Sequence, residues 1–404
     1  MRILWISNAP GLYANTSNYN GCGWVASLQH GLSTQMSNSL QLGIAFPWKE
    51  NIKTKSDTIV YYGIKKLRLR QTFFSQKKYE QLTMVRLKEI VNDFKPDLIH
   101  IFGSEHLISL ISEYTEIPTV LHLQGILSAY RETWLPEGMS WFKFYTMQPR
   151  QIIDKIVLNR GIKRELRIFK SCQNYMGRTD WDYSISQLLS PNSNYFYCNE
   201  TLRPIIYNSS KIWNYHNRTK IIITSLISSP IYKGGDLVLR AANYLKNYTN
   251  FDFEWNIYGT NDISRFEKLT HIKANNVNVK ACGIITAEKI VDIITDSDIY
   301  VHPSYIENSP NSVCEAQLLG VPVIATNVGG VSSLISNEKN GILVPANDPY
   351  YLAYKIKQII SNKNLAIKLG TNGRETALER HNPKQIVNEL ISIYQQIILK
   401  NKRS

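Results

Sequence analysis

The sequence predicts an α/β protein with two doubly wound domains, each a mostly parallel sheet covered by helices. Short apolar or β-branched runs that end in Gly, Ser, Asn or Pro alternate with stretches of helical periodicity, which is typical of parallel sheets. The runs are apolar on both faces, as strands buried inside such a sheet must be. A chain of 404 residues also suits two domains, at about 100–200 residues for each.

The predicted elements follow one another in the order that this fold class requires. Each run is taken as a strand because its β-branched and apolar residues stop at a turn-forming residue. Strands are predicted at residues 3–7, 98–103, 119–124, 221–225, 255–259, 277–282, 299–303, 321–326 and 341–344. Helices are predicted at residues 25–32, 237–245, 287–295, 313–319, 351–360 and 384–399.

The series of strands begins anew near residue 220, which divides the chain into two domains and a final helix. Residues 1–205 are predicted to form the first domain, 206–383 the second, and 384–404 a helix that crosses back to the first. Turn-forming residues such as Pro204 concentrate before residue 220, as expected of a connection between domains. Because ligands of open α/β sheets bind beyond the carboxyl ends of the strands, the two domains are expected to face each other across a cleft.

The chain has a formal net charge of +14, and most of that excess lies in two segments. Residues 49–89 hold eleven basic and four acidic residues, and residues 131–170 hold nine basic and four acidic residues. Such charge attracts nucleic acid, acidic lipid or a phosphorylated small molecule. The sequence has no zinc-finger, KH or RNP signature, so nucleic acid is not expected. Apolar residues among the cations of 139–170 suit either an anionic membrane surface or an amphipathic helix packed on its own sheet.

Five cysteines without a C-x-x-C spacing argue against disulfides and a zinc site, and favour a reducing cytosol. The first six residues indicate a buried strand rather than a signal peptide, and no run approaches the roughly 18–20 apolar residues that span a bilayer. The protein is therefore expected in the cytoplasm, free or peripheral on the inner face of the membrane. Asp180/Asp182 and Asp296/Asp298 have D-x-D spacing, but the second pair lies at a turn, where aspartates satisfy backbone amides, so no metal is expected.

Residues 301–316 form the most specific constellation, because a strand, a polar loop and a helix start are combined there with two carboxylates. Backbone N–H groups at the start of a helix can bind a phosphate. Glu307 precedes the loop and Glu315 lies one turn inside the helix, so both can accept hydrogen bonds from the hydroxyls of one ligand. Ser312 and Glu315 also have the spacing of a capping box, which is a purely structural alternative.

From about residue 221 to residue 359, the chain resembles the C-terminal domain of the retaining glycosyltransferases of family 4, which have the GT-B fold of two Rossmann-like domains. The resemblance rests on the order and spacing of several motifs, each of which is weak alone. They are PIYKGG at 230–235, WNIYG at 255–259, DIYVHPS at 298–304, the pair Glu307 and Glu315, GVPVIAT at 320–326, VGG at 328–330 and GILV at 341–344.

The resemblance implies that these residues bind a nucleotide-sugar donor. Glu315 would hold the ribose hydroxyls, Glu307 would contact the transferred sugar, and Lys233 would stabilise the departing diphosphate. The family usually has an arginine five residues before this lysine, where the chain has Ser228, so phosphate binding is weaker or another cation replaces it. The loop residues implied to approach the sugar and the diphosphate are Asn308, Ser309, Asn311, Ser312 and Val313.

Motifs in the N-terminal half resemble the family less closely. Gly21 and Gly23 match a loop whose backbone approaches the diphosphate, although a cysteine separates them; a tight turn is the structural alternative. His122 ends a predicted strand, and the resemblance implies that it hydrogen-bonds the donor sugar. The structural alternative is a histidine at a strand end whose hydrogen bonds are satisfied within the protein. Trp24 and Arg178 are candidates for the acceptor side, and an ion pair is the alternative role of Arg178.

The resemblance implies a retaining glycosyltransferase with Glu307, His122 and Lys233 as catalytic residues. It would move a sugar from a UDP- or GDP-linked donor to a glycan or lipid-linked glycan acceptor in cell-surface polysaccharide synthesis, with no metal or other cofactor. No nucleophilic carboxylate is evident near His122. The resemblance implies that the leaving phosphate itself helps take the acceptor's proton on the same face. The alternatives are a nucleotide-sugar epimerase of the same two-domain architecture and a basic nucleic-acid-binding protein.

Overall fold

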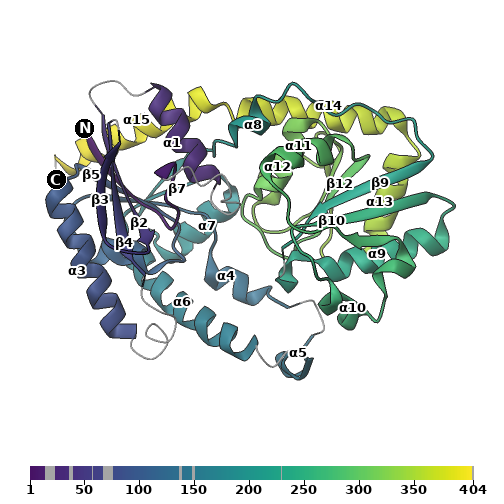
Figure 1. Cartoon of the computed structure of the whole chain (residues 1–404), viewed down its shortest axis with the longest axis horizontal. Helices are drawn as coiled ribbons and strands as arrows, with labels where there is room; N and C mark the ends of the chain where they lie inside the picture. The colour runs from purple at the N-terminus through teal and green to yellow at the C-terminus, as the bar shows by residue number, and fades with distance from the viewer. Residues whose placement is uncertain are drawn as a thin grey trace. The chain divides into compact units, whose positions relative to one another are not determined.

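The computed structural model describes residues 1–13, 23–35, 40–56, 58–66, 76–135, 139–147, 151–228 and 230–402. The chain forms two compact units (Figure 1). The sequence predicted domain boundaries at 205/206 and 383/384, with 129–151 in the first domain, whereas in the structure that segment belongs to the second unit. The first unit comprises Met1–Ser128, Ile152–Thr201 and Asn382–Ser404, and the second comprises Ala129–Gln151 and Leu202–His381.

An eight-stranded sheet forms the centre of the first unit, in the order β3-β4-β2-β1-β5-β6-β7-β8. Neighbouring strands are parallel except β3 and β4, which form an antiparallel edge. The strands are β1 (Arg2–Ile6), β2 (Gln41–Trp48), β3 (Ile52–Ser56), β4 (Ile59–Lys65), β5 (Leu98–Phe102), β6 (Thr119–His122), β7 (Asn174–Gly177) and β8 (Asn194–Tyr197). The helices are α1 (Gly23–Gln35), α3 (Gln76–Phe94), η2 (Leu107–Glu113), α6 (Gln151–Ser171), α7 (Asp180–Leu189) and α15 (Pro383–Asn401). Along the chain, the division between the units falls inside α4 (Leu127–Glu132).

The last helix, α15, belongs to the core of the first unit although it ends the chain (Figure 1). Its buried residues recur every three or four positions, so one apolar face covers the sheet. Trp5 on β1 donates a hydrogen bond from Nε1 to the hydroxyl oxygen of Tyr394 at 3.0 Å. The residues of α15 in this core are Ile386, Val387, Leu390, Ile393, Tyr394 and Ile397.

A six-stranded parallel sheet forms the centre of the second unit, in the order β11-β10-β9-β12-β13-β14. The strands are β9 (Lys220–Leu226), β10 (Asp252–Tyr258), β11 (Val279–Ala281), β12 (Ile299–His302), β13 (Val323–Thr326) and β14 (Ile342–Val344). The helices are α5 (Trp141–Met147), α8 (Pro204–Tyr207), η3 (Ile231–Lys233), α9 (Gly235–Tyr248), α10 (Ser264–Thr270), η4 (Ala274–Val277), α11 (Ala287–Thr295), α12 (Asn311–Leu319), η5 (Val331–Ser333), α13 (Pro349–Ile360) and α14 (Lys363–Arg380).

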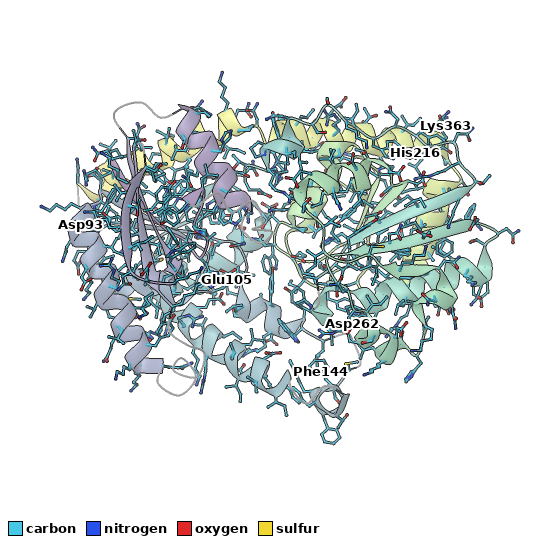
Figure 2. The ribbon with its side chains drawn as sticks, in the orientation of Figure 1. Asp93, Glu105, Phe144, His216, Asp262 and Lys363 are labelled. Carbon is cyan, nitrogen blue, oxygen red and sulfur yellow. The ribbon has the colours of Figure 1, made fainter. Side chains whose placement is uncertain are left out.

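The segment 129–151 joins the second unit because its aromatic residues pack there. Phe144 on α5, labelled in Figure 2, is 1% exposed and lies in the same core cluster as Leu202. The rings of Tyr130 and Trp134 lie 5.5 and 5.1 Å from the ring of Tyr232. Part of the basic segment 131–170 therefore contributes to a hydrophobic core, which its charge count alone did not indicate.

Ion pairs neutralise part of the two basic segments. Lys53 on β3 pairs with Asp93 on α3 at 2.7 Å. Arg167 on α6 pairs with both Glu80 and Glu113. Residues 57, 67–75, 136–138 and 148–150 of these segments lie outside the described part of the chain. No helix among the described residues has the length and apolarity needed to cross a membrane.

Candidate functional site

The loops that follow β9 and β12 meet at the carboxyl ends of these neighbouring strands. Gly234 lies between η3 and α9 with φ +74°, a conformation that glycine adopts without steric cost. A Cβ at this position would lie 1.9 Å from the carbonyl oxygen of Pro303, so the close approach of the two loops also requires glycine. The amide of Tyr305 donates to the carbonyl oxygen of Tyr232 at 2.7 Å and ties the loops together.

This approach brings Lys233 and Glu307 together. Lys233 Nζ donates a hydrogen bond to Glu307 Oε1, and Ser304 Oγ donates to the same oxygen at 3.1 Å. His302 Nε2 lies 3.7 Å from it. Burial alone would raise the pKa of Glu307, but Lys233 and His302 outweigh burial and lower it to about 2. The carboxylate is therefore ionised beside the Lys233 ammonium group.

The backbone of Glu307 is held by the loop that follows β13. The amide of Gly330 donates to the carbonyl oxygen of Glu307 at 3.0 Å. Gly329 has φ +51°, and a Cβ there would lie 1.9 Å from that same carbonyl oxygen. The VGG motif at 328–330 therefore requires glycine at position 329, because any Cβ there would collide with the carbonyl oxygen of Glu307.

The helix α12 begins at Asn311, directly after the Glu307 loop. Its N-cap is Pro310, and no side chain makes a capping hydrogen bond there in the described structure. The capping box weighed as an alternative for Ser312 and Glu315 is therefore wrong. Ser312 Oγ instead lies 3.4 Å from His302 Nδ1. Val313, like Glu315, is buried on this helix, whereas Asn308 and Ser309 are buried in the loop that precedes it.

Glu315 has a partner that the sequence analysis did not select. Arg203 binds both carboxylate oxygens, from Nε to Oε1 at 2.9 Å and from Nη2 to Oε2 at 2.7 Å. The side chain of Glu315 is 3% exposed, and burial raises its pKa despite the guanidinium. The two residues lie 112 positions apart. No spacing rule connects them, and the only signal for Arg203 was its place before Pro204 in the connecting segment.

The first unit brings three predicted residues together at the carboxyl ends of its strands. His122 ends β6, and the ring of Trp24, at the start of α1, meets its ring edge to face at 4.9 Å. The guanidinium of Arg178 lies 5.1 Å from the Trp24 ring centroid and 3.3 Å from Glu200. The ion pair weighed for Arg178 is therefore present. Gly23 is the first residue of α1, whereas Gly21 lies outside the described residues.

The two D-x-D pairs have structural partners. Arg218 binds Asp296 at 3.3 Å and Asp298 at 2.9 Å, and Asp298 also accepts a hydrogen bond from the amide of Ile222 at 2.7 Å. This cluster lies at the amino end of β12, away from the carboxyl end where the Glu307 loop begins. Asp182 forms a capping box with Thr179 at the start of α7. Both pairs thus have the turn and cap roles that aspartates commonly have.

A polar pocket of about 550 Å³ lies in the first unit at the amino ends of β6, β7 and β8. Thr119, Asn174 and Asn194 line it. Ligands of parallel α/β sheets bind at the carboxyl ends instead. The pocket is therefore no part of the candidate site.

Two units, each built on a mostly parallel sheet, are the architecture expected of the GT-B class. The structure is similar to sucrose-phosphate synthase from Thermosynechococcus elongatus, with a TM-score of 0.74 and 16% identity over 99% of this chain and 100% of that chain. It is also similar to Anabaena HepE solved in complex with UDP and glucose, with a TM-score of 0.63 and 14% identity over 98% of this chain and 100% of that chain. These similarities confirm the predicted GT-B fold.

Residues 211–376 match the family of glycosyl transferases group 1. The chain is 30% identical over 138 residues to an uncharacterized glycosyltransferase of Methanocaldococcus jannaschii, covering 34% of this chain and 35% of the relative. It is 25% identical over 199 residues to the N,N'-diacetylbacillosaminyl-diphospho-undecaprenol alpha-1,3-N-acetylgalactosaminyltransferase of Campylobacter jejuni, covering 48% and 51%. The matches thus span about a third and about a half of these relatives.

The chain therefore contains a group 1 glycosyltransferase domain at residues 211–376. The match at residues 211–376 and the names of these relatives support the predicted enzyme class, a glycosyltransferase. Nothing in these matches supports the alternative of a nucleotide-sugar epimerase.

Proposed function

We propose that the protein is a retaining glycosyltransferase that moves a sugar from a UDP- or GDP-linked donor to a glycan or lipid-linked glycan in cell-surface polysaccharide synthesis. The observation that carries the proposal is the pairing of Lys233 with Glu307 at the carboxyl end of β12, inside the matched domain. Support for the donor comes from the UDP in the HepE structure. Support for the acceptor comes from the diphospho-undecaprenol in the name of the Campylobacter relative.

In this proposal, Lys233 stabilises the charge that develops on the departing diphosphate. The bond between the anomeric carbon and the diphosphate oxygen breaks, and the acceptor oxygen bonds to that carbon on the same face of the sugar. The acceptor proton passes to the leaving phosphate. A preorganised cation near the leaving oxygen typically contributes a factor of about 10²–10³ to such a step. Glu307 holds Lys233 in place and accepts hydrogen bonds from sugar hydroxyls.

The other donor contacts are assigned as the motifs imply. Glu315 holds ribose hydroxyls, and the 308–313 loop approaches the sugar and diphosphate. Arg203 already occupies both oxygens of Glu315, so ribose must share or displace this guanidinium. Arg203 also supplies a cation in the same unit as Ser228, which stands where the family usually has arginine. No metal or other cofactor takes part in the proposed reaction.

A panel of nucleotide sugars tests the proposed donor. Binding of the right donor should raise the melting temperature in proportion to the logarithm of its concentration over Kd. Transfer should then produce a glycoside whose anomeric configuration, read by NMR, equals that of the donor. The reaction should persist in excess EDTA. An inverted product, or a change in the donor sugar without any acceptor, would contradict the proposal.

We also propose that the protein works at the inner face of the membrane, with α6 as a contact for anionic lipid. Ile153 and Val157, four positions apart on α6, are 56% and 54% exposed, and Lys155 and Lys163 lie on the same helix. Exposed apolar residues beside cations suit an anionic interface.

Vesicle flotation tests this contact. The protein should float with vesicles that contain phosphatidylglycerol at low salt, and the variant Ile153→Ser/Val157→Ser should float less. Leu188→Ser on α7, where Leu188 is 79% exposed, is the matched control. Equal flotation of all three proteins, or none, would contradict the proposed contact.

A further inference from the structure

Four buried side chains of the first unit form one hydrogen-bonded row that ends at His122. Trp5 Nε1 lies 3.0 Å from the Tyr394 hydroxyl, which lies 2.6 Å from His100 Nδ1. His100 Nε2 in turn lies 3.2 Å from His122 Nδ1. The row crosses from β1 through α15 to β5 and β6, all in the first unit, where β5 pairs with both β1 and β6.

The chemistry of each group fixes the direction of these hydrogen bonds. The indole Nε1 can only donate, so the Tyr394 oxygen accepts from Trp5. The hydroxyl hydrogen of Tyr394 then needs an acceptor, because a buried donor without one is costly. Among the described residues, His100 Nδ1 is the remaining partner of this hydroxyl. Tyr394 therefore donates to His100 Nδ1, which carries no hydrogen.

Both histidines are neutral in this environment. Burial lowers the pKa of His100 to about 3, and it lowers the pKa of His122 well below its usual value, with further contributions from His100 and Arg178. A neutral imidazole carries one hydrogen. Since His100 Nδ1 accepts, the hydrogen of His100 is on Nε2 and is donated to His122 Nδ1. The hydrogen of His122 is consequently on its Nε2.

That Nε2 atom is the end of the row. It is buried and has no hydrogen-bond partner among the described residues, although the residue as a whole is only 1% exposed. Neighbouring rings fix its direction: Trp24 meets His122 edge to face, and Phe102 stacks on His100 with centroids 4.0 Å apart. An unsatisfied buried donor at the carboxyl end of β6 indicates a ligand acceptor atom.

We propose that Trp5, Tyr394 and His100 lock His122 in the Nε2–H form, so that His122 donates a hydrogen bond to a substrate oxygen and does not act as a general base. The identity of that oxygen, a hydroxyl of the transferred sugar, rests on the proposed function. Tyr394 and His100 are positioning residues, since they act through His122. The C-terminal helix thereby sets the hydrogen-bonding state of His122 through His100, which lies 294 positions from Tyr394 in the sequence.

The tautomer is measured directly in the free protein by ¹⁵N NMR with labelled histidine, and the His122 signal is assigned by its absence from His122→Gln. The expected spectrum shows a pyridine-type Nδ1 and a pyrrole-type Nε2 for both His100 and His122. A protonated Nδ1 on His122 would overturn the proposal. This measurement needs no substrate, so it stays valid if the proposed function is wrong.

Tyr394→Phe tests the lock, because it removes the hydroxyl and keeps the ring. His122 should then populate both tautomers, and kcat/KM should fall about tenfold, as expected for one lost hydrogen-bond alignment. Tyr175→Phe is the matched control, since Tyr175 is equally buried and its hydroxyl donates to the Phe169 carbonyl at 2.7 Å. An unchanged tautomer in Tyr394→Phe would contradict the lock.

Replacement of His122 itself separates donation from base catalysis. The amide nitrogen of glutamine reaches the position of Nε2–H, whereas that of asparagine lies nearer the position of Nδ1. His122→Gln should therefore retain at least tenfold more kcat/KM than His122→Asn. Equal losses in both variants, together with a pH profile whose acidic limb appears only in the wild type, would indicate a general base instead.

Discussion

The two units present opposite chemistry at the carboxyl ends of their sheets. In the second unit, Lys233 and Glu307 form an ion pair, and Arg203 and Glu315 form another. In the first unit, His122 lies in a neutral row of hydrogen-bonded and stacked rings. The charged groups suit a diphosphate and hydroxyls, whereas the neutral row suits a single aligned hydrogen bond. Substitutions should therefore act mainly through charge in one unit and through alignment in the other.

Loss of Lys233 should have the largest effect. Lys233→Ala removes the cation proposed to stabilise the leaving diphosphate, so kcat/KM should fall about 10²–10³-fold. Glu307→Gln should also lower kcat/KM, because Lys233 loses its counterion. Lys273→Ala is the matched control: Lys273 pairs with Glu267 at 3.0 Å in the same unit but is 73% exposed. Full transfer by both Lys233→Ala and Glu307→Gln would refute the assigned site.

Gly234→Ala tests whether the charged pair depends on the close approach of two loops. The new Cβ would meet the Pro303 carbonyl oxygen at 1.9 Å, and the left-handed backbone adds about 1–2 kcal/mol of strain. We expect the free energy of unfolding to fall by about 3 kcal/mol or more in denaturant titration.

Gly283→Ala separates the two contributions to that loss. Gly283 has φ +82°, but its Cβ would meet only the side chain of Asn261 at 2.7 Å. In Gly283→Ala the free energy of unfolding should therefore fall by only about 1–2 kcal/mol, which is the backbone strain alone. Equal losses in the two variants would mean that the loop contact at Gly234 contributes nothing.

The Arg203 to Glu315 pair should contribute more to stability than an exposed pair of the same unit. Arg203→Met leaves a carboxylate that is 3% exposed without its guanidinium, which should lower the free energy of unfolding by about 3 kcal/mol. Lys211→Met breaks a pair with Asp292 whose side chains are 54% and 69% exposed, and should cost less than about 1 kcal/mol. Similar losses would show that burial of Glu315 is unimportant.

The comparison also shows what the sequence could predict. Strands such as β1, β5 and β12 are apolar on both faces because helices cover both sides, and this pattern is visible in one short window. The edge strand β3 has the pattern IKTKS and is mostly exposed, so no apolar signal marked it. The family motifs selected Lys233 and Glu307 one at a time, and only the structure shows that their two loops, 74 positions apart in the sequence, come together.

The missed residues depend on the path of the whole chain. Tyr394 meets Trp5 across 389 positions, and Arg203 meets Glu315 across 112 positions. Segment 129–151 likewise belongs to the second unit because Phe144 packs in the hydrophobic core of that unit. Each of these contacts pairs ordinary residues at arbitrary spacing, so only the folded structure identifies the partner.

The two carboxylates of one motif, Glu307 and Glu315, should respond oppositely to pH. The folded-state pKa of Glu307 is lowered to about 2, so its ionised form stabilises the protein above about pH 5, and this contribution is lost as pH falls toward 2. The pKa of Glu315 is raised, so its contribution to stability increases as pH falls and is lost as pH rises. As pH falls from 6 to 4, the free energy of unfolding of Glu307→Gln, measured by denaturant titration, should rise relative to that of the wild type. The free energy of unfolding of Glu315→Gln should decrease relative to that of the wild type. If both differences from the wild type changed in the same direction with pH, Arg203 would offset the burial of Glu315 as effectively as Lys233 offsets the burial of Glu307.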